Sequence, residues 1–183
     1  MSVKSKTQTG HPEAKDALLD RLAIVELAAR FADAANRIDT AVFSDLWTND
    51  GVWEIGPPVN QRFSGRAAIV SAFEQLLKDR WQVFIQLPSA SYVAEVDGDR
   101  ATGRGYVNEI AKSKNAESND NFNLSIYEDI CERQSGVWRF RQRRYRVLYL
   151  DETQLGGHGI EGQPSTLMEP TSDPVVPKDR GTQ

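Results

Sequence analysis

The chain has 183 residues, with 26 acidic against 22 basic side chains, a formal net charge of −4 and a single cysteine. An acidic balance argues against non-specific nucleic-acid binding, and no apolar run approaches the roughly 20 residues that a membrane-spanning helix needs. One cysteine can form neither an intrachain disulfide nor a zinc site built from several thiolates. We therefore expect a soluble, cytoplasmic, single-domain protein that binds neither membrane nor nucleic acid.

The first half of the chain is predicted to be mainly helical. Apolar residues recur every three or four positions over 14–38, a short second helix is expected over 40–47, and a third over 66–78. A turn at 48–51 and a strand at 51–55 lie between the second and third helices, and 61–64 can resume that strand.

After the third helix the apolar period changes from about 3.6 residues to 2. This change predicts long strands over 81–96, 101–112, 122–133 and 137–150. Asp97-Gly98-Asp99 is a good hairpin turn, because Asp-Gly readily adopts positive φ. Helices followed by successive antiparallel strands predict an α+β fold.

The two ends of the chain differ from its middle. Residues 1–12 are polar and show no periodicity, whereas residues 152–183 are rich in Pro and Gly and contain no aromatic side chain. Such segments cannot bury enough apolar surface to offset their ordering entropy. We expect a flexible segment at 1–12, a folded domain at 13–151 and an extended tail at 152–183.

Several segments, in this order, resemble the SnoaL-like family of the NTF2-like superfamily. The matching segments are Ile24–Asp39, Phe43–Trp53, Phe63–Ile69, Val96–Ala101, Tyr127–Asp129 and Gly136–Phe140. The resemblance implies a cone, in which three N-terminal helices pack on a strongly bent, mainly antiparallel sheet that encloses a pocket. It also implies a homodimer or higher homo-oligomer, formed through the outer sheet face and the C-terminal tail.

The same resemblance points to Asp39 as a pocket residue. In related dehydratases and a dehydrochlorinase, an aspartate at the end of the first helix orients a histidine that acts as a general base. The position of that histidine is Gln86 here, and the only histidines, His11 and His158, lie in the segments expected to be loose. Glutamine has no titratable nitrogen, so the usual pair is incomplete.

Different interpretations of Asp39 stay open. Burial could raise its pKa and make it the base, with Gln86 holding a substrate carbonyl or hydroxyl. Alternatively the pocket binds a ligand without chemistry, or Asp39 is the N-cap of the helix that begins at Thr40.

Further residues are candidates for lining the pocket. Period-2 alternation from Trp138 and Phe140 places Arg144 on the core side of the last strand. Glu54 and Glu109 could be second carboxylates of the site, but exposed strand positions are the favoured explanation for both. The predicted substrate-binding residues are Trp53, Phe84, Tyr106, Asn108, Tyr127 and Arg144.

No nucleotide-binding glycine motif and no metal-binding pattern occurs in the sequence, so we expect no cofactor and no metal. The expected function is proton transfer, of lyase or isomerase type, on a small hydrophobic or aromatic (polyketide- or steroid-like) molecule, with Asp39 as base. The alternative is a non-catalytic ligand-binding or structural subunit, resembling the β-subunits of ring-hydroxylating dioxygenases. A catalyst should have a closed, dry pocket and an Asp39 of raised pKa, whereas a structural subunit should have a filled cone and co-purify with a catalytic chain.

Overall fold

The computed structural model describes residues 12–115 and 117–159. The predicted arrangement is confirmed: two helices, two strands, a third helix and then a meander of strands. No helix of the described residues is long and apolar enough to cross a membrane. The helices are α1 (Pro12–Arg37), α2 (Thr40–Asp45) and α3 (Arg66–Leu77). The strands are β1 (Trp47–Ile55), β2 (Gln61–Ser64), β3 (Trp81–Pro88), β4 (Val93–Asp97), β5 (Arg100–Ser113), β6 (Asn121–Gln134) and β7 (Val137–Asp151).

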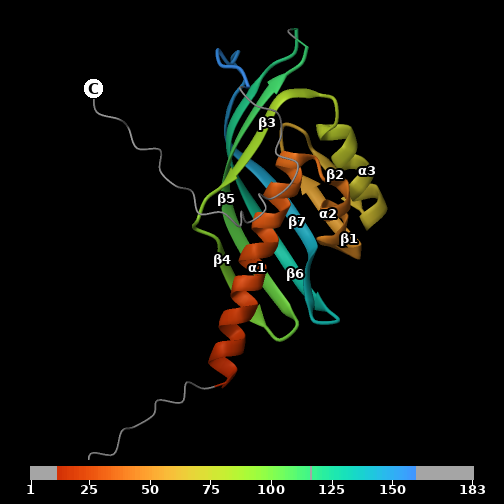
Figure 1. The fold of residues 1–183 in the computed structure, drawn as a ribbon, viewed down its shortest axis with the longest axis vertical. Helices are drawn as coiled ribbons and strands as arrows, with labels where there is room; N and C mark the ends of the chain where they lie inside the picture. Colours follow the sequence, from red (N-terminus) through yellow and green to blue (C-terminus); the bar gives the residue numbers. More distant parts are fainter. Residues whose placement is uncertain (1–11, 116, 160–183) are drawn as a thin grey trace, which may run out of the picture.

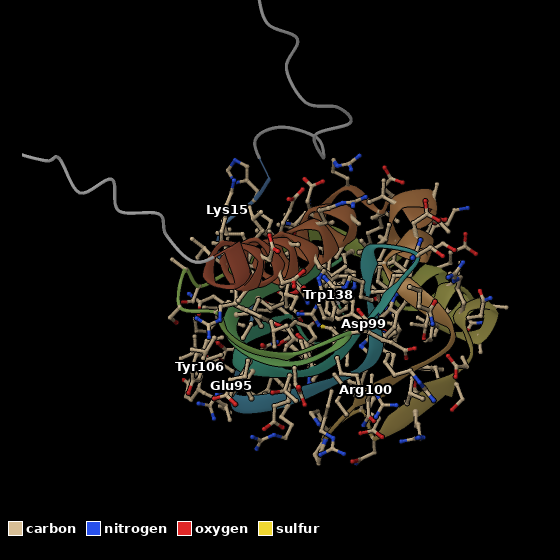
Figure 2. The ribbon with its side chains drawn as sticks, turned by 90° about the horizontal axis from the view of Figure 1, so that it is seen from below. Lys15, Glu95, Asp99, Arg100, Tyr106 and Trp138 are labelled. Carbon is tan, nitrogen blue, oxygen red and sulfur yellow. The ribbon has the colours of Figure 1, made fainter. Side chains whose placement is uncertain are left out.

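All seven strands belong to one mixed sheet that curls without closing. Its order is β2-β1-β7-β6-β5-β3, and β4 pairs with β5 beyond the end of β3. The β1–β7 pair is parallel and the other pairs are antiparallel. Helix α1 runs across one face of the sheet, beside α2 and α3 (Figures 1 and 2). The α+β cone expected from the resemblance is therefore the observed architecture.

Two element boundaries differ from the predictions. The single strand expected over 81–96 is interrupted at 89–92, because Pro88 has no N–H to continue the ladder. Tyr92 then turns inward and lies over Gly103 and Gly105 of β5, where there is no side chain to obstruct its ring. The turn expected at 48–51 lies inside β1, which shifts register on β7 between Trp47 and Val52.

A bulge in β7 changes which side chains point into the fold. Cys131 of β6 pairs with Phe140, but Ile130 pairs with Gln142, so Arg141 is an extra residue. Alternation restarts after the bulge, and Arg143 and Tyr145 are buried. The prediction that Arg144 faces the core was therefore wrong: this side chain is exposed and pairs with Glu54, with 2.6 Å between the Arg144 Nε and Glu54 Oε2 atoms.

The core between the helices and the sheet is mainly aromatic. Phe43 of α2 stacks on Phe73 of α3 with ring centroids 3.9 Å apart. Phe31 of α1 contacts both Trp47 and Phe140. These rings fill one end of the cone and hold α1 at a fixed height above the sheet, which leaves a hollow beside them.

Candidate functional site

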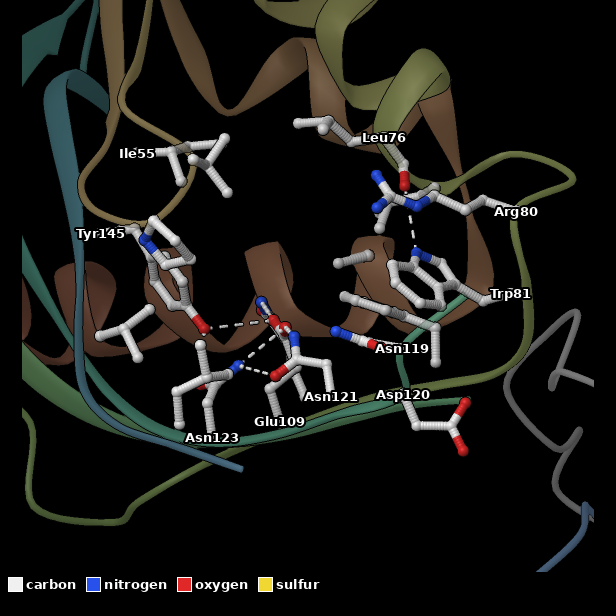
Figure 3. A pocket seen from close by; sticks show the side chains of 18 of the residues that line it. Ile55, Leu76, Arg80, Trp81, Glu109, Asn119, Asp120, Asn121, Asn123 and Tyr145 are labelled. Carbon is white, nitrogen blue, oxygen red and sulfur yellow. Dashed lines mark hydrogen bonds between the residues drawn. The ribbon is translucent and has the colours of Figure 1, made fainter. Parts of the chain in front are cut away.

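A cavity of about 500 Å³ lies between the helices and the curled sheet. Its apolar wall is built from α1, α3 and strands β1 and β3, which contribute Phe31, Trp53, Phe73, Leu76, Trp81 and Phe84. The Trp81 indole is fixed by a hydrogen bond of 3.1 Å from its Nε1 atom to the Leu76 carbonyl oxygen (Figure 3). The cone is therefore not packed solid, and the cavity has the size of a typical small-molecule site.

The opposite wall is polar and is centred on Glu109 of β5. One carboxylate oxygen, Oε1, accepts hydrogen bonds of 3.0 Å each from the side-chain amides of Asn121 and Asn123. The other, Oε2, accepts one of 2.6 Å from Gln86 and faces the Tyr145 hydroxyl at 3.3 Å. Figure 3 shows Asn121 and Asn123 of β6 and Tyr145 of β7 converging on Glu109, and Gln86 comes from β3. We call Gln86, Glu109, Asn121, Asn123, Tyr127 and Tyr145 the polar wall.

The Glu109 carboxyl group is buried without a cation. Its residue is only 8% exposed, and no ion pair to it is formed among the described residues. Burial raises its pKa above the ordinary glutamate value, and the hydrogen bonds from Gln86, Asn123, Tyr145 and Asn121 offset only part of that rise. A carboxyl group of this kind takes up a proton more readily than one in water.

A count of hydroxyl protons shows which oxygen of this carboxyl group has a lone pair without a close donor. The Tyr145 hydroxyl has one proton, and its nearest acceptor is Asn123 Oδ1 at 2.7 Å rather than Glu109 Oε2 at 3.3 Å. When Tyr145 donates to Asn123, the Oε2 atom retains a lone pair that no strong donor occupies. This lone pair is where Glu109 can accept a proton.

Gln86 is held in place from two directions. Asn36 of α1 clamps its backbone, donating to the Gln86 carbonyl oxygen at 2.9 Å and accepting from the Gln86 N–H at 2.7 Å. The Gln86 side chain donates to Glu109 and to the Tyr127 hydroxyl oxygen, the latter at 3.2 Å. Asn36 was not among the predicted site residues, yet it, rather than Asp39, connects the end of α1 to Gln86.

Asp39 lies outside this cavity and has the capping role. Its Oδ1 atom accepts a hydrogen bond of 3.0 Å from the Val42 backbone N–H at the start of α2, and its Oδ2 atom lies 2.8 Å from the Arg37 Nη1 atom. The Val42 N–H and the Arg37 guanidinium hold the pKa of Asp39 below its ordinary value. The geometry thus favours the N-cap and lends no support to Asp39 as a base.

The remaining predicted residues divide into two groups. Trp53, Phe84 and Tyr127 line the cavity, together with Gln86. Tyr106 and Asn108 do not line it, because Val107 and Glu109 are the inward-facing residues of this part of β5. Figure 2 shows Tyr106 pointing away from the sheet, and its side chain is 47% exposed.

Glu109 had been set aside as an exposed strand position, and the sequence carried a signal that could have found it. The residues that share its face of β5 are Ala101, Gly103, Gly105, Val107 and Ala111. A single carboxylate on a face of small and apolar residues indicates a buried, hydrogen-bonded acid. The amides of Asn121 and Asn123 on the neighbouring strand are the donors that such an acid requires.

No metal-binding constellation occurs in the part of the chain that the structure describes: it contains no group of three or more His, Cys, Asp or Glu side chains placed to hold a metal ion. His158 lies in the irregular segment after β7, and His11 falls outside the described residues, as do 1–10 and 160–183. The expected flexibility of both ends therefore stays a prediction.

Comparison with solved structures identifies the fold class of this protein. The fold is that of NTF2-like proteins: an NTF2-like protein with a cystatin-like fold from Novosphingobium aromaticivorans aligns with a TM-score of 0.63 and 22% identity, over 79% of this chain and 92% of that one. A type 2 hexachlorocyclohexane dehydrochlorinase aligns with a TM-score of 0.71 and 19% identity, over 81% and 97% of the two chains. A scytalone dehydratase-like protein from N. aromaticivorans has a TM-score of 0.68 and 17% identity, over 79% and 95%.

The family follows from the sequence match. Residues 16–144 match the model of the SnoaL-like domain, so this chain belongs to the SnoaL-like family. No curated protein matches the chain significantly. The resemblance recognised in the sequence is therefore confirmed, and the three structural neighbours named above, each below 25% identity, bear on the fold alone.

Proposed function

We propose that this protein is an enzyme that transfers a proton on a small hydrophobic ring substrate, and that Glu109 is the acid–base group. The observation that carries the proposal is a buried carboxyl group on the wall of an aromatic-lined cavity, with no cationic partner among the described residues. Catalytic acids and bases are commonly found in such surroundings, because burial moves their pKa toward neutral pH.

The proposed step is proton abstraction next to a carbonyl group. The C–H bond breaks and its proton passes to Glu109 Oε2, while the electron pair forms a C=C bond and moves charge to the carbonyl oxygen. The Tyr127 hydroxyl is placed to donate a hydrogen bond to that oxygen, since burial raises the Tyr127 pKa and keeps the hydroxyl protonated. Return of the proton to the same or a conjugated carbon restores Glu109 and completes an exchange or an isomerisation.

A bicyclic ketone, β-tetralone, is a suitable probe, because exchange of its α-hydrogens for deuterium reports this step directly. We expect the protein to accelerate exchange in D₂O, followed by proton NMR. Glu109→Gln should lower the acceleration by about 10²–10⁴-fold, the usual contribution of a general base. Asp39→Asn is the control and should leave it unchanged.

The second candidate is a ligand-binding protein without catalysis. It is favoured by the absence of a titratable imidazole from the described cavity wall and by the capping role of Asp39. The same experiment separates the two: if β-tetralone binds but exchanges no faster than in buffer, binding without chemistry is the better account.

The outer sheet face supports the proposal of a homo-oligomer. Leu87, Asn108, Leu124 and Tyr149 are successive cross-strand partners on β3, β5, β6 and β7. The three apolar members of this row are 55%, 40% and 53% exposed, in that order. A second copy could cover this row. Light scattering should give a dimer or larger species for the wild type and a smaller species for Leu124→Glu.

A further inference from the structure

The polar wall contains one donor and one acceptor that the fold leaves without a close partner. The two Gln86 amide protons point to Glu109 Oε2 at 2.6 Å and to the Tyr127 oxygen at 3.2 Å. The Gln86 Oε1 atom has only the Tyr127 hydroxyl near it, at 3.5 Å, the limit of a hydrogen bond. Within the described residues, the Tyr127 proton and the Gln86 carbonyl oxygen thus lack good partners.

Both groups are deep inside the protein, where an unused polar group is costly. Gln86 and Tyr127 are each 5% exposed, and both line the cavity. The orientation of the Gln86 amide is set by Glu109, since an ionised carboxylate only accepts hydrogen bonds and so selects the NH₂ end. The Oε1 atom is consequently fixed on the side of Tyr127. A bound group that forms hydrogen bonds with both atoms therefore gains binding free energy, because it supplies the two hydrogen bonds that the empty cavity does not form.

We propose that the Gln86–Tyr127 pair recognises a single uncharged hydroxyl group on the ligand, such as a phenol or an enol. A hydroxyl oxygen accepts from Tyr127 and its proton is donated to Gln86 Oε1, so one ligand atom satisfies both protein groups. The inference rests on the proposed function only in using the same cavity, and it matches the enol that proton transfer from a ketone produces.

The charges around the cavity oppose the competing ligand class, carboxylates. A carboxylate has no proton to give to Gln86 Oε1 and would lie close to Glu109. The other ionisable side chains lining the cavity, apart from the tyrosines, are Arg80 and the acids Glu117, Asp120 and Glu152. The Arg80 guanidinium lies over the Trp81 ring, 4.5 Å from its centroid, outside the polar wall.

The test compares three ligands of one shape by isothermal titration calorimetry on the full chain. β-Naphthol carries the hydroxyl, β-methylnaphthalene replaces it with a methyl group, and β-naphthoate carries a carboxylate. We expect β-naphthol to bind at least tenfold more tightly than β-methylnaphthalene, and β-naphthoate to bind most weakly. Equal affinities for naphthol and methylnaphthalene, or tightest binding of naphthoate, would overturn the inference.

Two variants locate the effect. Tyr127→Phe keeps the ring and should reduce the preference for naphthol to less than threefold, and Gln86→Leu should do the same. The control, Tyr106→Phe, removes a hydroxyl from the outer face and should leave the preference intact. Unchanged preference in both cavity variants, each folded by circular dichroism, contradicts the assignment.

The failure of this inference and that of the proposed function give different results. Deuterium exchange in the wild type and in Glu109→Gln tests the proposed function, whereas the naphthol preference of the wild type and of Tyr127→Phe tests the Gln86–Tyr127 pair. If the wild type prefers naphthol but does not accelerate deuterium exchange, the hydroxyl site stands and the proposed enzyme function fails. If the wild type accelerates exchange but shows no preference for naphthol, the enzyme function stands and the hydroxyl site fails.

Discussion

Two buried carboxylates on neighbouring strands lie in contrasting surroundings. Asp129 of β6 is 4% exposed, lies 3.3 Å from Arg143 Nε and accepts a hydrogen bond of 2.7 Å from the Tyr92 hydroxyl. The Arg143 guanidinium lies over the Tyr127 and Phe140 rings, 3.8 and 4.3 Å from their centroids. Glu109, a few residues away across the sheet, has only neutral donors and lies on the cavity wall.

The two sites differ in what opposes the effect of burial on the pKa of the carboxyl group. Burial raises the pKa of Asp129 as well, but the positive charge of the Arg143 guanidinium opposes that rise, and the Tyr92 hydroxyl adds a hydrogen bond that also opposes it. At Glu109 burial also raises the pKa, but among the described residues only hydrogen bonds from neutral amides and a phenol oppose the rise, and no cation does. The protein has both arrangements within one sheet, and Glu109 is the one that lines the aromatic-walled cavity described above.

The largest expected effect is the loss of Arg143. Arg143→Met leaves Asp129 buried without a cation, which should lower the free energy of unfolding by about 3–5 kcal/mol. Urea denaturation measures it. Arg144→Met is the matched control on the exposed side of the same strand and should cost at most about 1 kcal/mol. Equal costs for the two variants would show that the Asp129 pair contributes little.

The contact between Tyr92 and β5 gives a smaller effect. A Cβ atom at Gly105 would lie 2.5 Å from Tyr92 Cδ2, so Gly105→Ala should force the ring aside and destabilise the fold by about 1–3 kcal/mol. In a Tyr92→Ala background the same change should cost much less. Additive effects in this cycle, measured by thermal unfolding, would show that the two residues do not interact.

The N-cap comes next. Asp39→Ala removes the acceptor for the Val42 N–H and should cost about 1 kcal/mol of stability, while Asp39→Ser should keep most of it. Neither change should reduce deuterium exchange into β-tetralone. Loss of exchange in a folded Asp39→Ser variant would restore Asp39 as a participant in the chemistry.

The pH dependence of stability gives the smallest effect. Because the folded-state pKa of Glu109 is raised, the folded protein holds this proton more tightly than the unfolded chain. Stability should therefore fall as the pH rises from about 4.3, the ordinary glutamate value, to the folded pKa. Glu109→Gln has no such titration, so its Tm relative to the wild type should rise across that interval. A Tm difference that is constant with pH would contradict the raised pKa.

Much of the fold could be predicted because the spacing of apolar residues along the chain indicates where helices and strands lie. The change from a helical to a strand period at the end of α3, the Asp97–Asp99 turn and the order of family-like segments are all local features of the sequence. They were enough to predict three helices, a mainly antiparallel bent sheet and a cavity.

The site was harder to predict because it depends on single-residue offsets. The bulge at Arg141 reverses the face of everything after it, so alternation from Trp138 wrongly placed Arg144 inside. Asn36 and Asp39 lie one turn apart near the end of α1, and only the exit of the chain after Arg37 decides which of them reaches Gln86. Glu109 was visible as the one acid on a face of small residues, but its amide donors come from another strand.

The most direct test of the central idea is a carbon-13 NMR titration of the Glu109 side-chain carboxyl, assigned by the signal that disappears in Glu109→Gln. The account predicts a midpoint above about 4.3, the value of glutamate in water. A midpoint at or below that value would mean that the amide donors outweigh burial, and that Glu109 is a structural carboxylate like Asp129 rather than the acid–base group of the cavity.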